Sequence, residues 1–273
     1  MKLQPINNFS DFMSAYSWQQ RLRSKVRDSA VVSLSPFKRI PRKDNWIRFP
    51  YYHHVFNDER ESFARQLKYM KNFGDFISLD DAIEMLESDS SIQGRYFCIT
   101  FDDGFKNCAT NAVPILINHN APASFFLPTK YIGSASGEAL DFWLPIRVSV
   151  EFLNWEDCRE MMRSGMSFGA HTVSHRLLID LSDTEVEKEL RDSKEHIERE
   201  FQIPCQHFCC PVGQPDIDFS TNRDPEIARR LGYRSFLTTR RGSASRKPKP
   251  MLLERDHVIA GWSNHQLRYF FSF

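Results

Sequence analysis

Short apolar runs alternate with amphipathic stretches along most of the chain. Six runs are rich in aromatic and β-branched residues, as strands are: RFPYYHHVF (48–56), RYFCITF (95–101), ASFFLP (123–128), MSFGAHT (166–172), QHFCCP (206–211) and RSFLTT (234–239). Between them, apolar residues recur at helical spacing around 60–72, 79–88, 106–118, 155–164, 182–201 and 224–232. Strands that alternate with helices predict βαβ units and a parallel sheet, either open or closed into a barrel.

The first 47 residues do not follow this alternation. We expect residues 1–47 to form an irregular arm ahead of a domain of residues 48–273, because Pro36 and Pro41 interrupt any long helix. Between Arg21 and Lys43 the arm carries eight basic residues against one acid. Such an arm could be solvated, fold back on the domain, rest on an anionic membrane surface or bind an anionic substrate carrier.

Composition narrows the class of protein. The chain has 273 residues, of which 41% are hydrophobic, and a net charge of +1, so we expect a sizeable core and no nucleic-acid partner. The N-terminus shows no apolar signal segment, and no apolar run approaches the ~18 residues that span a bilayer. The six cysteines form no CxxC pair, which favours reduced thiols and a cytoplasmic protein.

Chemistry-bearing residues gather at the ends of three predicted strands. In FCITFDDGF, Asp102 and Asp103 follow an apolar strand directly. Two buried like charges repel, and each costs several kcal/mol unless a cation or a proton compensates it. His171 follows a second strand and Pro211 to Gly213 follow a third. Because the carboxyl ends of parallel strands share one edge, we expect these residues to meet there.

A metal ion would resolve the conflict between the two carboxylates. His171 and His175 are four residues apart, and a helical turn would place both imidazoles on one face. With Asp103 they make a set of two histidines and one carboxylate, which leaves positions open for water and substrate. Asp102 would then be free to take a proton from a water activated at the metal. Each motif alone is weak, but their combination at strand ends is specific.

Three motifs resemble those of one known family. TFDDGF (100–105), GAHTVSH (169–175) and CPVG (210–213) are similar to the first three motifs of the polysaccharide deacetylases, the NodB-homology domain, and the resemblance covers about residues 48–262. It implies a distorted (β/α) barrel and one divalent metal, which we expect to be zinc. By resemblance, the metal ligands are Asp103, His171 and His175, the general base is Asp102, the oxyanion donor is the Val212 N–H, and Pro211 and Gly213 contact substrate.

The chain also departs from the family pattern. Many members carry an arginine two residues before the motif proline, where it orients the base, and Cys209 stands there instead. The motif that supplies the general acid is not recognisable. His257 is our candidate for the acid, with His265 behind it, although His257 could equally be a structural residue of a strand. His53 and His54 could also face the site and bind substrate.

The resemblance implies the hydrolytic removal of an N-acyl group, most simply acetyl, from an amino sugar. Its substrate would be a precursor of a surface polysaccharide, linked to a nucleotide or a lipid, and peripheral membrane contact through the basic arm would fit a lipid-linked one. The alternative is an inactive member of the same fold that only binds saccharide. Cys209 and Cys210 have no adjacent base in the sequence, which argues against a thiol nucleophile. In aspartyl phosphatases one residue separates the two acids, and FDDG lacks it, which argues against that class of enzyme.

Overall fold

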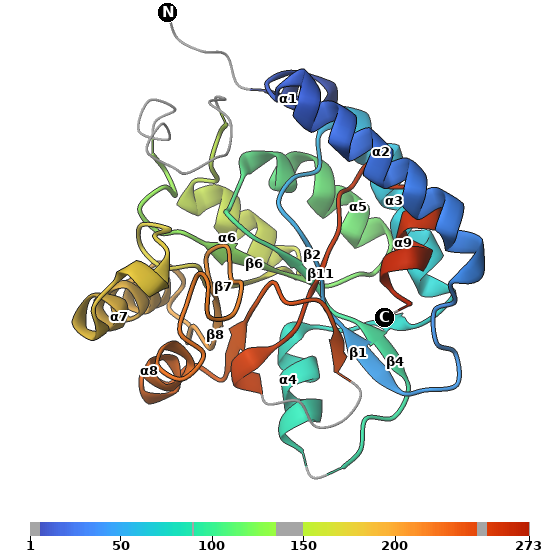
Figure 1. The fold of residues 1–273 in the computed structure, drawn as a ribbon. Helices are drawn as coiled ribbons and strands as arrows, with labels where there is room; N and C mark the ends of the chain where they lie inside the picture. The colour runs from blue at the N-terminus through green and yellow to red at the C-terminus, as the bar shows by residue number, and fades with distance from the viewer. Residues whose placement is uncertain (1–5, 89, 135–149, 245–249, 273) are drawn as a thin grey trace, which may run out of the picture.

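The computed structural model describes residues 6–88, 90–134, 150–244 and 250–272. A seven-stranded sheet, in the order β11-β2-β5-β6-β7-β8-β9, curls into a partial barrel, and a four-stranded sheet, β10-β1-β4-β3, lies at its lower end (Figure 1). All described pairs in the larger sheet are parallel, with Tyr51 opposite Thr100 and Thr100 opposite Ser124. The predicted α/β fold with a distorted barrel is confirmed.

Two of the predicted strands change sheets midway. The strands are β1 (Trp46–Arg48), β2 (Pro50–Tyr52), β3 (Asp75–Phe76), β4 (Arg95–Phe97), β5 (Ile99–Phe101), β6 (Ala123–Leu127), β7 (Ser167–Ala170), β8 (His207–Cys209), β9 (Ser235–Leu237), β10 (Ser243–Ala244) and β11 (Asp256–His257). The single strands predicted over 48–56 and 95–101 are therefore wrong in detail. At Phe49 and Cys98 the chain passes from the small sheet to the large one, a break that depends on strand partners and not on local sequence.

Six of the described helices lie close to their predicted positions: α3 (Arg60–Lys71), α4 (Leu79–Glu87), α5 (Val113–Asn118), α6 (Trp155–Arg163), α7 (Asp183–Phe201) and α8 (Asp224–Arg230). The helix α9 (Asn264–Phe270) was not predicted, nor were the single turns η2 (Asn57–Glu59), η5 (Leu178–Asp180) and η6 (Pro250–Leu252). The stretch predicted over 106–118 begins as a π-helix, η3 (Cys108–Ala112), because Pro114 has no N–H for a regular helical bond. Within the described ranges, none of the helices is both long and apolar enough to cross a bilayer.

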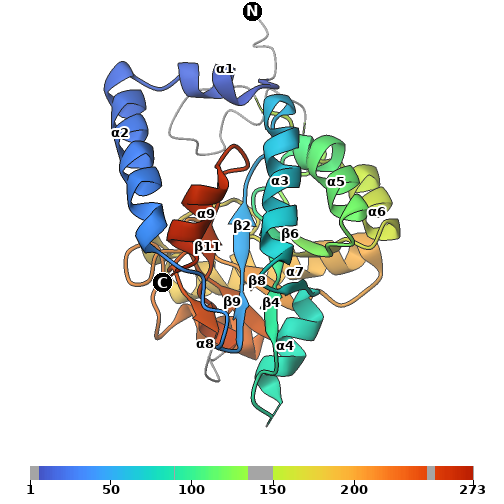
Figure 2. The same cartoon turned by 90° about the vertical axis from the view of Figure 1, so that its right-hand side faces the viewer.

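The prediction of an irregular N-terminal arm is wrong. Residues 9–37 form α1 (Phe9–Ser14), α2 (Trp18–Leu34) and the turn η1 (Ser35–Phe37), and we call this segment the arch. A capping box between Ser17 and Gln20 starts α2, and the helix ends just before Pro36. Figure 2 shows α1 crossing the top of the domain and α2 descending beside it to α9.

The arch is attached at both ends. At the α1 end, the Asp58 carboxylate accepts hydrogen bonds from the N–H groups of Phe9 and Ser10, at 2.7 and 3.2 Å. At the α2 end, Val31 is buried and the Ser35 Oγ lies 2.9 Å from the His265 Nδ1. The arch therefore folds back on the domain, which was one of the arrangements left open by the sequence.

Candidate active site

Asp102 and Asp103 lie immediately after β5 and point in different directions. The Asp102 N–H donates to the Tyr52 carbonyl and so continues the sheet, whereas Asp103 has a positive φ of 71°. The backbone reversal turns the second carboxylate away from the first. Both side chains are nevertheless buried, at 2% and 6% exposure, so each must be neutralised separately.

Asp103 faces the two predicted histidines. Its Oδ1 lies 3.3 Å from the His171 Nε2 and 3.2 Å from the His175 Nε2, and it is a buried oxygen without a hydrogen-bond partner in the described part of the chain. Tetrahedral ligands with bonds of about 2.0–2.1 Å to zinc stand about 3.3–3.4 Å apart. The three atoms are thus spaced as ligands of one small divalent cation.

A backbone contact fixes which nitrogen of His171 faces that position. The His171 Nδ1 lies 2.7 Å from the Cys209 carbonyl oxygen, which can only accept, so Nδ1 carries the proton. The lone pair is then on Nε2, the atom that faces Asp103. Such an outer contact is the usual means of orienting a histidine that binds a metal.

The predicted helical turn between the histidines is wrong. Residues 171–175 form a loop in which Thr172 and His175 have positive φ values of 63° and 57°. The Glu189 carboxylate from α7 holds this loop by accepting hydrogen bonds from the N–H groups of Val173 and Ser174, at 2.8 and 2.9 Å. The four-residue spacing brings the imidazoles together through a tight turn, and Glu189 was not foreseen.

Asp102 is paired with an arginine that the sequence did not reveal. The Arg255 guanidinium binds both carboxylate oxygens, Nη1 to Oδ1 at 2.8 Å and Nη2 to Oδ2 at 2.7 Å, and its own exposure is 0%. Burial alone would raise the pKa of Asp102, but the charge and hydrogen bonds of Arg255 outweigh it, and this pKa is lowered overall. Asp102 is therefore an oriented, ionised carboxylate.

Arg255 makes the contact with the base that the resemblance assigns to the motif arginine, which Cys209 replaces. Its Nη2 is 3.0 Å from the Cys209 Sγ, and that thiol lies 3.5 Å from the Asp102 Oδ1. The guanidinium reaches the carboxylate from the segment before β11 and not from the end of β8. No local motif indicates that an arginine from this segment would bind Asp102. The one hint in the sequence is a charged pair, Arg255 and Asp256, inside a strand-like run.

A second group of possible metal ligands is less suitable. Asp102, His171 and Cys209 also lie close together, but the Arg255 guanidinium donates to both the carboxylate and the thiol. A cation there would meet this positive charge. Burial also raises the pKa of the Cys209 thiol well above its usual range, so no thiolate is available. The set with Asp103, His171 and His175 is the better metal site.

The loop after β8 presents a backbone donor. Val212 and Gly213 both have positive φ values, 57° and 73°, and this conformation is strained for the β-branched Val212. No hydrogen bond within the described residues uses the Val212 N–H, and the residue lines the cavity next to the two aspartates. Pro211 precedes it and is buried. Of seven described non-glycine residues with positive φ, four belong to the site: Asp103, Thr172, His175 and Val212.

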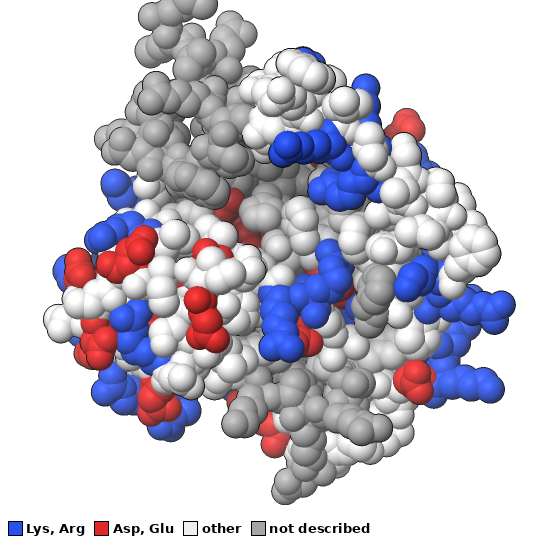
Figure 3. All heavy atoms as spheres, in the orientation of Figure 1, with Lys and Arg blue, Asp and Glu red and all other residues white. Residues whose placement is uncertain are grey.

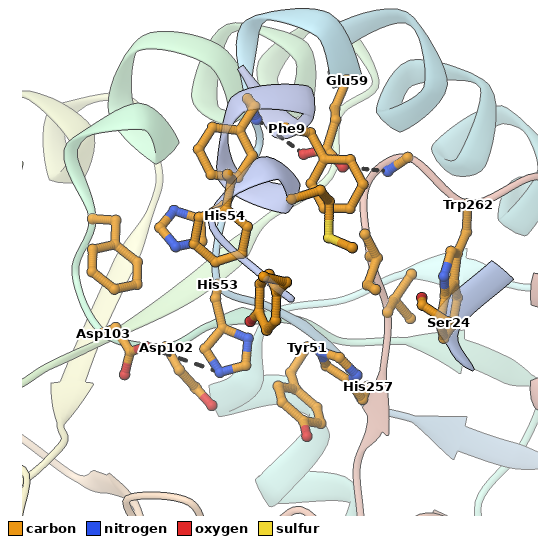
Figure 4. A pocket seen from close by; sticks show the side chains of 18 of the residues that line it. Phe9, Ser24, Tyr51, His53, His54, Glu59, Asp102, Asp103, His257 and Trp262 are labelled. Atoms are coloured by element: carbon orange, nitrogen blue, oxygen red, sulfur yellow. Dashed lines mark hydrogen bonds and ion pairs between the residues drawn. The ribbon is translucent and has the colours of Figure 1, made fainter. Parts of the chain in front are cut away.

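Of the four further histidines predicted as candidates, three lie at the cavity, in different surroundings (Figure 4). The His53 Nε2 lies 4.0 Å from the Asp103 Oδ2, and the His257 ring is 5.6 Å from that of His53. Burial lowers the pKa of His257 to about 3. His54 stacks against Phe56 and Phe105, with centroid distances of 4.7 and 4.0 Å, and thus forms part of the wall.

These groups line a cavity of about 780 Å³ between the barrel and the arch. The two aspartates, His171 and His175 lie on the barrel side, with His53 just after β2 and His257 at the end of β11. Phe12 from α1 and Tyr16 from the turn that follows it line the opposite side, together with Arg21 and Lys25 from α2. The candidate site is consequently roofed by the N-terminal segment, while His265 contacts Ser35 outside it.

Comparisons with known proteins identify the family of the chain. Residues 90–236 match the sequence profile of the family described as polysaccharide deacetylase. The Bacillus subtilis protein YxkH, named as a polysaccharide deacetylase, is 26% identical over 75% of this chain, and poly-beta-1,6-N-acetyl-D-glucosamine N-deacetylase of Staphylococcus aureus is 23% identical over 58%. The matches span 66% and 54% of those two proteins.

Solved structures show the same fold. The Streptococcus pyogenes deacetylase PplD, in complex with acetate, covers 84% of this chain with a TM-score of 0.67 and 24% identity, and the match spans 99% of that chain. IcaB from Ammonifex degensii covers 84% with a TM-score of 0.71 and 22% identity, over 98% of that chain. The profile match extends over more than half of the sequence and includes the aspartate, histidine and Pro-x-Gly motifs. The chain belongs to the polysaccharide deacetylase family.

Proposed function

We propose that the protein is a metal-dependent hydrolase that removes an N-acyl group, most simply acetyl, from an amino sugar. The observation that carries the proposal is that the two buried carboxylates have different partners: Asp103 faces two histidines, and Asp102 is paired with the cation of Arg255. One carboxylate serves to hold a cation, which we expect to be zinc, and the other stays ionised beside it. Amide hydrolysis requires this division between an electrophilic centre and a base.

Each residue of the site has a defined task in this reaction. Bound by Asp103, His171 and His175, the metal would supply Lewis acidity to the acyl carbonyl and to a nearby water. Asp102 accepts a proton as that water attacks, since its Oδ2 keeps a lone pair beyond the one that Arg255 occupies, whereas its Oδ1 also accepts from the Cys209 thiol. The Val212 N–H donates to the oxyanion. The amide C–N bond then breaks, and the acyl group leaves as a carboxylate.

The sugar amine must gain a proton as it leaves. We assign this role to His257, which lines the cavity next to His53. Because burial lowers the pKa of His257 to about 3, its ring is neutral at neutral pH and has to accept a proton within the cavity before it donates one. The alternative donor is Asp102 itself, which carries the proton taken from water. A His257→Ala variant that keeps full turnover would identify Asp102 as the donor.

For the substrate, we propose an N-acetylated amino sugar in a precursor of a surface polysaccharide. The Staphylococcus aureus relative is named for deacetylation of an N-acetylglucosamine polymer, which supports this sugar class. All six cysteines are free and buried, and on this basis we propose a cytoplasmic location. A member that only binds saccharide would not require the buried pair of Asp102 and Arg255.

The test uses the full chain after metal removal and after reloading with zinc. Short oligomers of N-acetylglucosamine and nucleotide-linked N-acetylamino sugars are incubated with each form, and acetate release and loss of the acetyl group are measured by mass spectrometry. Asp102→Asn, loaded with the same metal, serves as the matched control. We expect release from at least one substrate by the loaded wild type only. Saccharide binding without release in any loaded sample would establish the inactive alternative.

A further inference from the structure

The outer side of α2 carries an exposed apolar ridge. Trp18, Leu22 and Val26 are spaced by four residues, which places them in one line along the helix, and their exposures are 65%, 52% and 62%. The inner side carries Ser24, Asp28 and Val31, which are half-buried or buried. Because the ridge points away from both the domain and the cavity, it contributes nothing to folding or to the site.

Basic side chains stand on both flanks of this ridge. Helical spacing puts Arg21 and Lys25 on one flank and Arg23 and Arg27 on the other. The single acid of α2, Asp28, lies on the inner side and holds Arg27 through an ion pair of 3.0 Å. In Figure 3, Lys and Arg side chains gather over the region where Figure 1 places α2. An apolar line between two cationic flanks is typical of a helix that lies in a membrane interface.

A further exposed aromatic residue follows the end of α2. Phe37, in the turn η1, is 85% exposed, and two basic residues, Lys38 and Arg39, follow it. On its inner side the helix lines the cavity through Gln20, Ser24 and Asp28, and its flanking residues Arg21, Lys25 and Arg27 reach the cavity as well. A single helix thus separates the candidate active site from the apolar ridge.

We propose that the ridge of Trp18, Leu22 and Val26, with its basic flanks and Phe37, binds the surface of an anionic membrane. The apolar side chains would enter the interfacial region while the cations contact lipid phosphates. A second copy of the chain fits this face less well, because a symmetric pairing of two ridges would bring basic flanks against basic flanks. In combination with the proposed function, this placement points to an amino sugar that a lipid holds at the membrane.

Vesicle binding of the full chain tests the membrane contact without reference to the reaction. Co-sedimentation is measured with vesicles of phosphatidylglycerol and phosphatidylcholine and with vesicles of phosphatidylcholine alone, at low and high salt. We expect binding to the anionic vesicles at low salt, weaker binding at high salt and none to the neutral vesicles. Failure of the wild type to sediment with anionic vesicles at low salt would overturn the proposal.

A pair of matched variants locates the surface. Leu22→Glu with Val26→Glu places two acids on the ridge, and Ile117→Glu with Ile203→Glu places two acids at other exposed apolar positions of 46% and 49% exposure. The ridge variant should bind anionic vesicles about tenfold more weakly or worse, and the control variant should bind as the wild type does. Equal binding of the two variants would refute the assignment of this face.

Two further measurements separate the remaining outcomes. Leu22 and Val26 do not line the cavity, so the ridge variant should hydrolyse a soluble N-acetyl sugar at the wild-type rate. Vesicle binding by a wild type without hydrolytic activity would therefore defeat the proposed function and leave the membrane contact standing. Sedimentation velocity of the two variants and the wild type detects pairing of copies, and a dimer that only the ridge substitutions disrupt, without vesicle binding, would overturn the proposal.

Discussion

The pair of Arg255 and Asp102 gives the sharpest prediction. Replacing Arg255 with alanine leaves the Asp102 carboxylate 2% exposed and without its cation. Two charge-assisted hydrogen bonds, of 2.8 and 2.7 Å, are lost together. Removing one partner of a buried ion pair usually costs about 3–5 kcal/mol, because the other charge stays buried. We expect the free energy of unfolding to fall by about this amount.

The same change should disable the base but not the metal site. Without the guanidinium, nothing in the described structure fixes both Asp102 oxygens, and we expect turnover to fall by about 10²–10⁴. Arg255→Lys should lose less, since an ammonium group keeps the charge but cannot bind both oxygens in a planar fork. Metal content should stay at the wild-type level in both variants, because Asp103, His171 and His175 do not contact Arg255 in the described structure.

A rescue experiment distinguishes orientation of the base from general destabilisation. The Cys209 Sγ lies 3.5 Å from the Asp102 Oδ1 and 3.0 Å from the Arg255 guanidinium, so an arginine at 209 could enter the volume that Arg255→Ala vacates. We expect Cys209→Arg with Arg255→Ala to recover at least about tenfold in turnover over Arg255→Ala alone, within the range that a positioned base contributes. Urea unfolding, elemental analysis and acetate release are measured on all variants. Full activity of a folded Arg255→Ala protein would refute the reasoning.

Three other predictions concern the site and its surroundings. His171→Ala should lose the metal, since two of three protein ligands remain, and equal metal content in variant and wild type by elemental analysis would contradict the ligand set. Asp102→Asn should keep the metal and lose about 10²–10⁴ in turnover, and an active variant would exclude Asp102 as the base. Burial raises the pKa of Glu59 from 4.5 to about 7, against the hydrogen bonds from the N–H groups of Phe56 and Gly261, and nearby Asp58 adds to the rise. Between pH 4.5 and about pH 7 the folded protein therefore binds more protons than the unfolded chain. The free energy of unfolding should decrease by about 3 kcal/mol as the pH rises through this range. Glu59→Gln should abolish this decrease in urea titrations at about pH 5 and about pH 8, and parallel curves for the two proteins would contradict the assignment.

Local sequence predicted the parts of the fold that local interactions determine. The helix α7 follows the capping box of Ser182 and Glu185, and the carboxylates and histidines lie at strand ends as expected. The division of strands at Phe49 and Cys98 was not predictable, because the choice of sheet depends on partners far along the chain. The arch was missed because most large apolar residues of α2 face solvent and only Val31 is buried among its described residues, so its sequence does not show a buried stripe.

The candidate site was also predictable only where residues close in the sequence determine it. The spacing of His171 and His175 and the pair of aspartates were sufficient to predict a set in which both histidine Nε2 atoms lie within 3.3 Å of the Asp103 Oδ1. Arg255 is 153 residues away from Asp102 in the chain, and no motif connects them. The roles of His257, Val212 and Asp102 in catalysis stay predictions until the variants are measured.

Arg255 also belongs to the segment that spans the gap in the barrel. Strands β9 and β11 are the two edges of the large sheet, and residues 253–257 connect them through a bridge from Leu253 to Leu237 and the two-residue strand β11. Such a short edge element opens locally at a smaller free energy than the sheet itself. Opening withdraws Arg255 from Asp102 while the three metal-site residues, on other elements, stay in place. When the metal-loaded protein is warmed, a population that keeps the metal but has lost activity should therefore form before the barrel unfolds. Activity should be lost at a lower temperature than the metal is released.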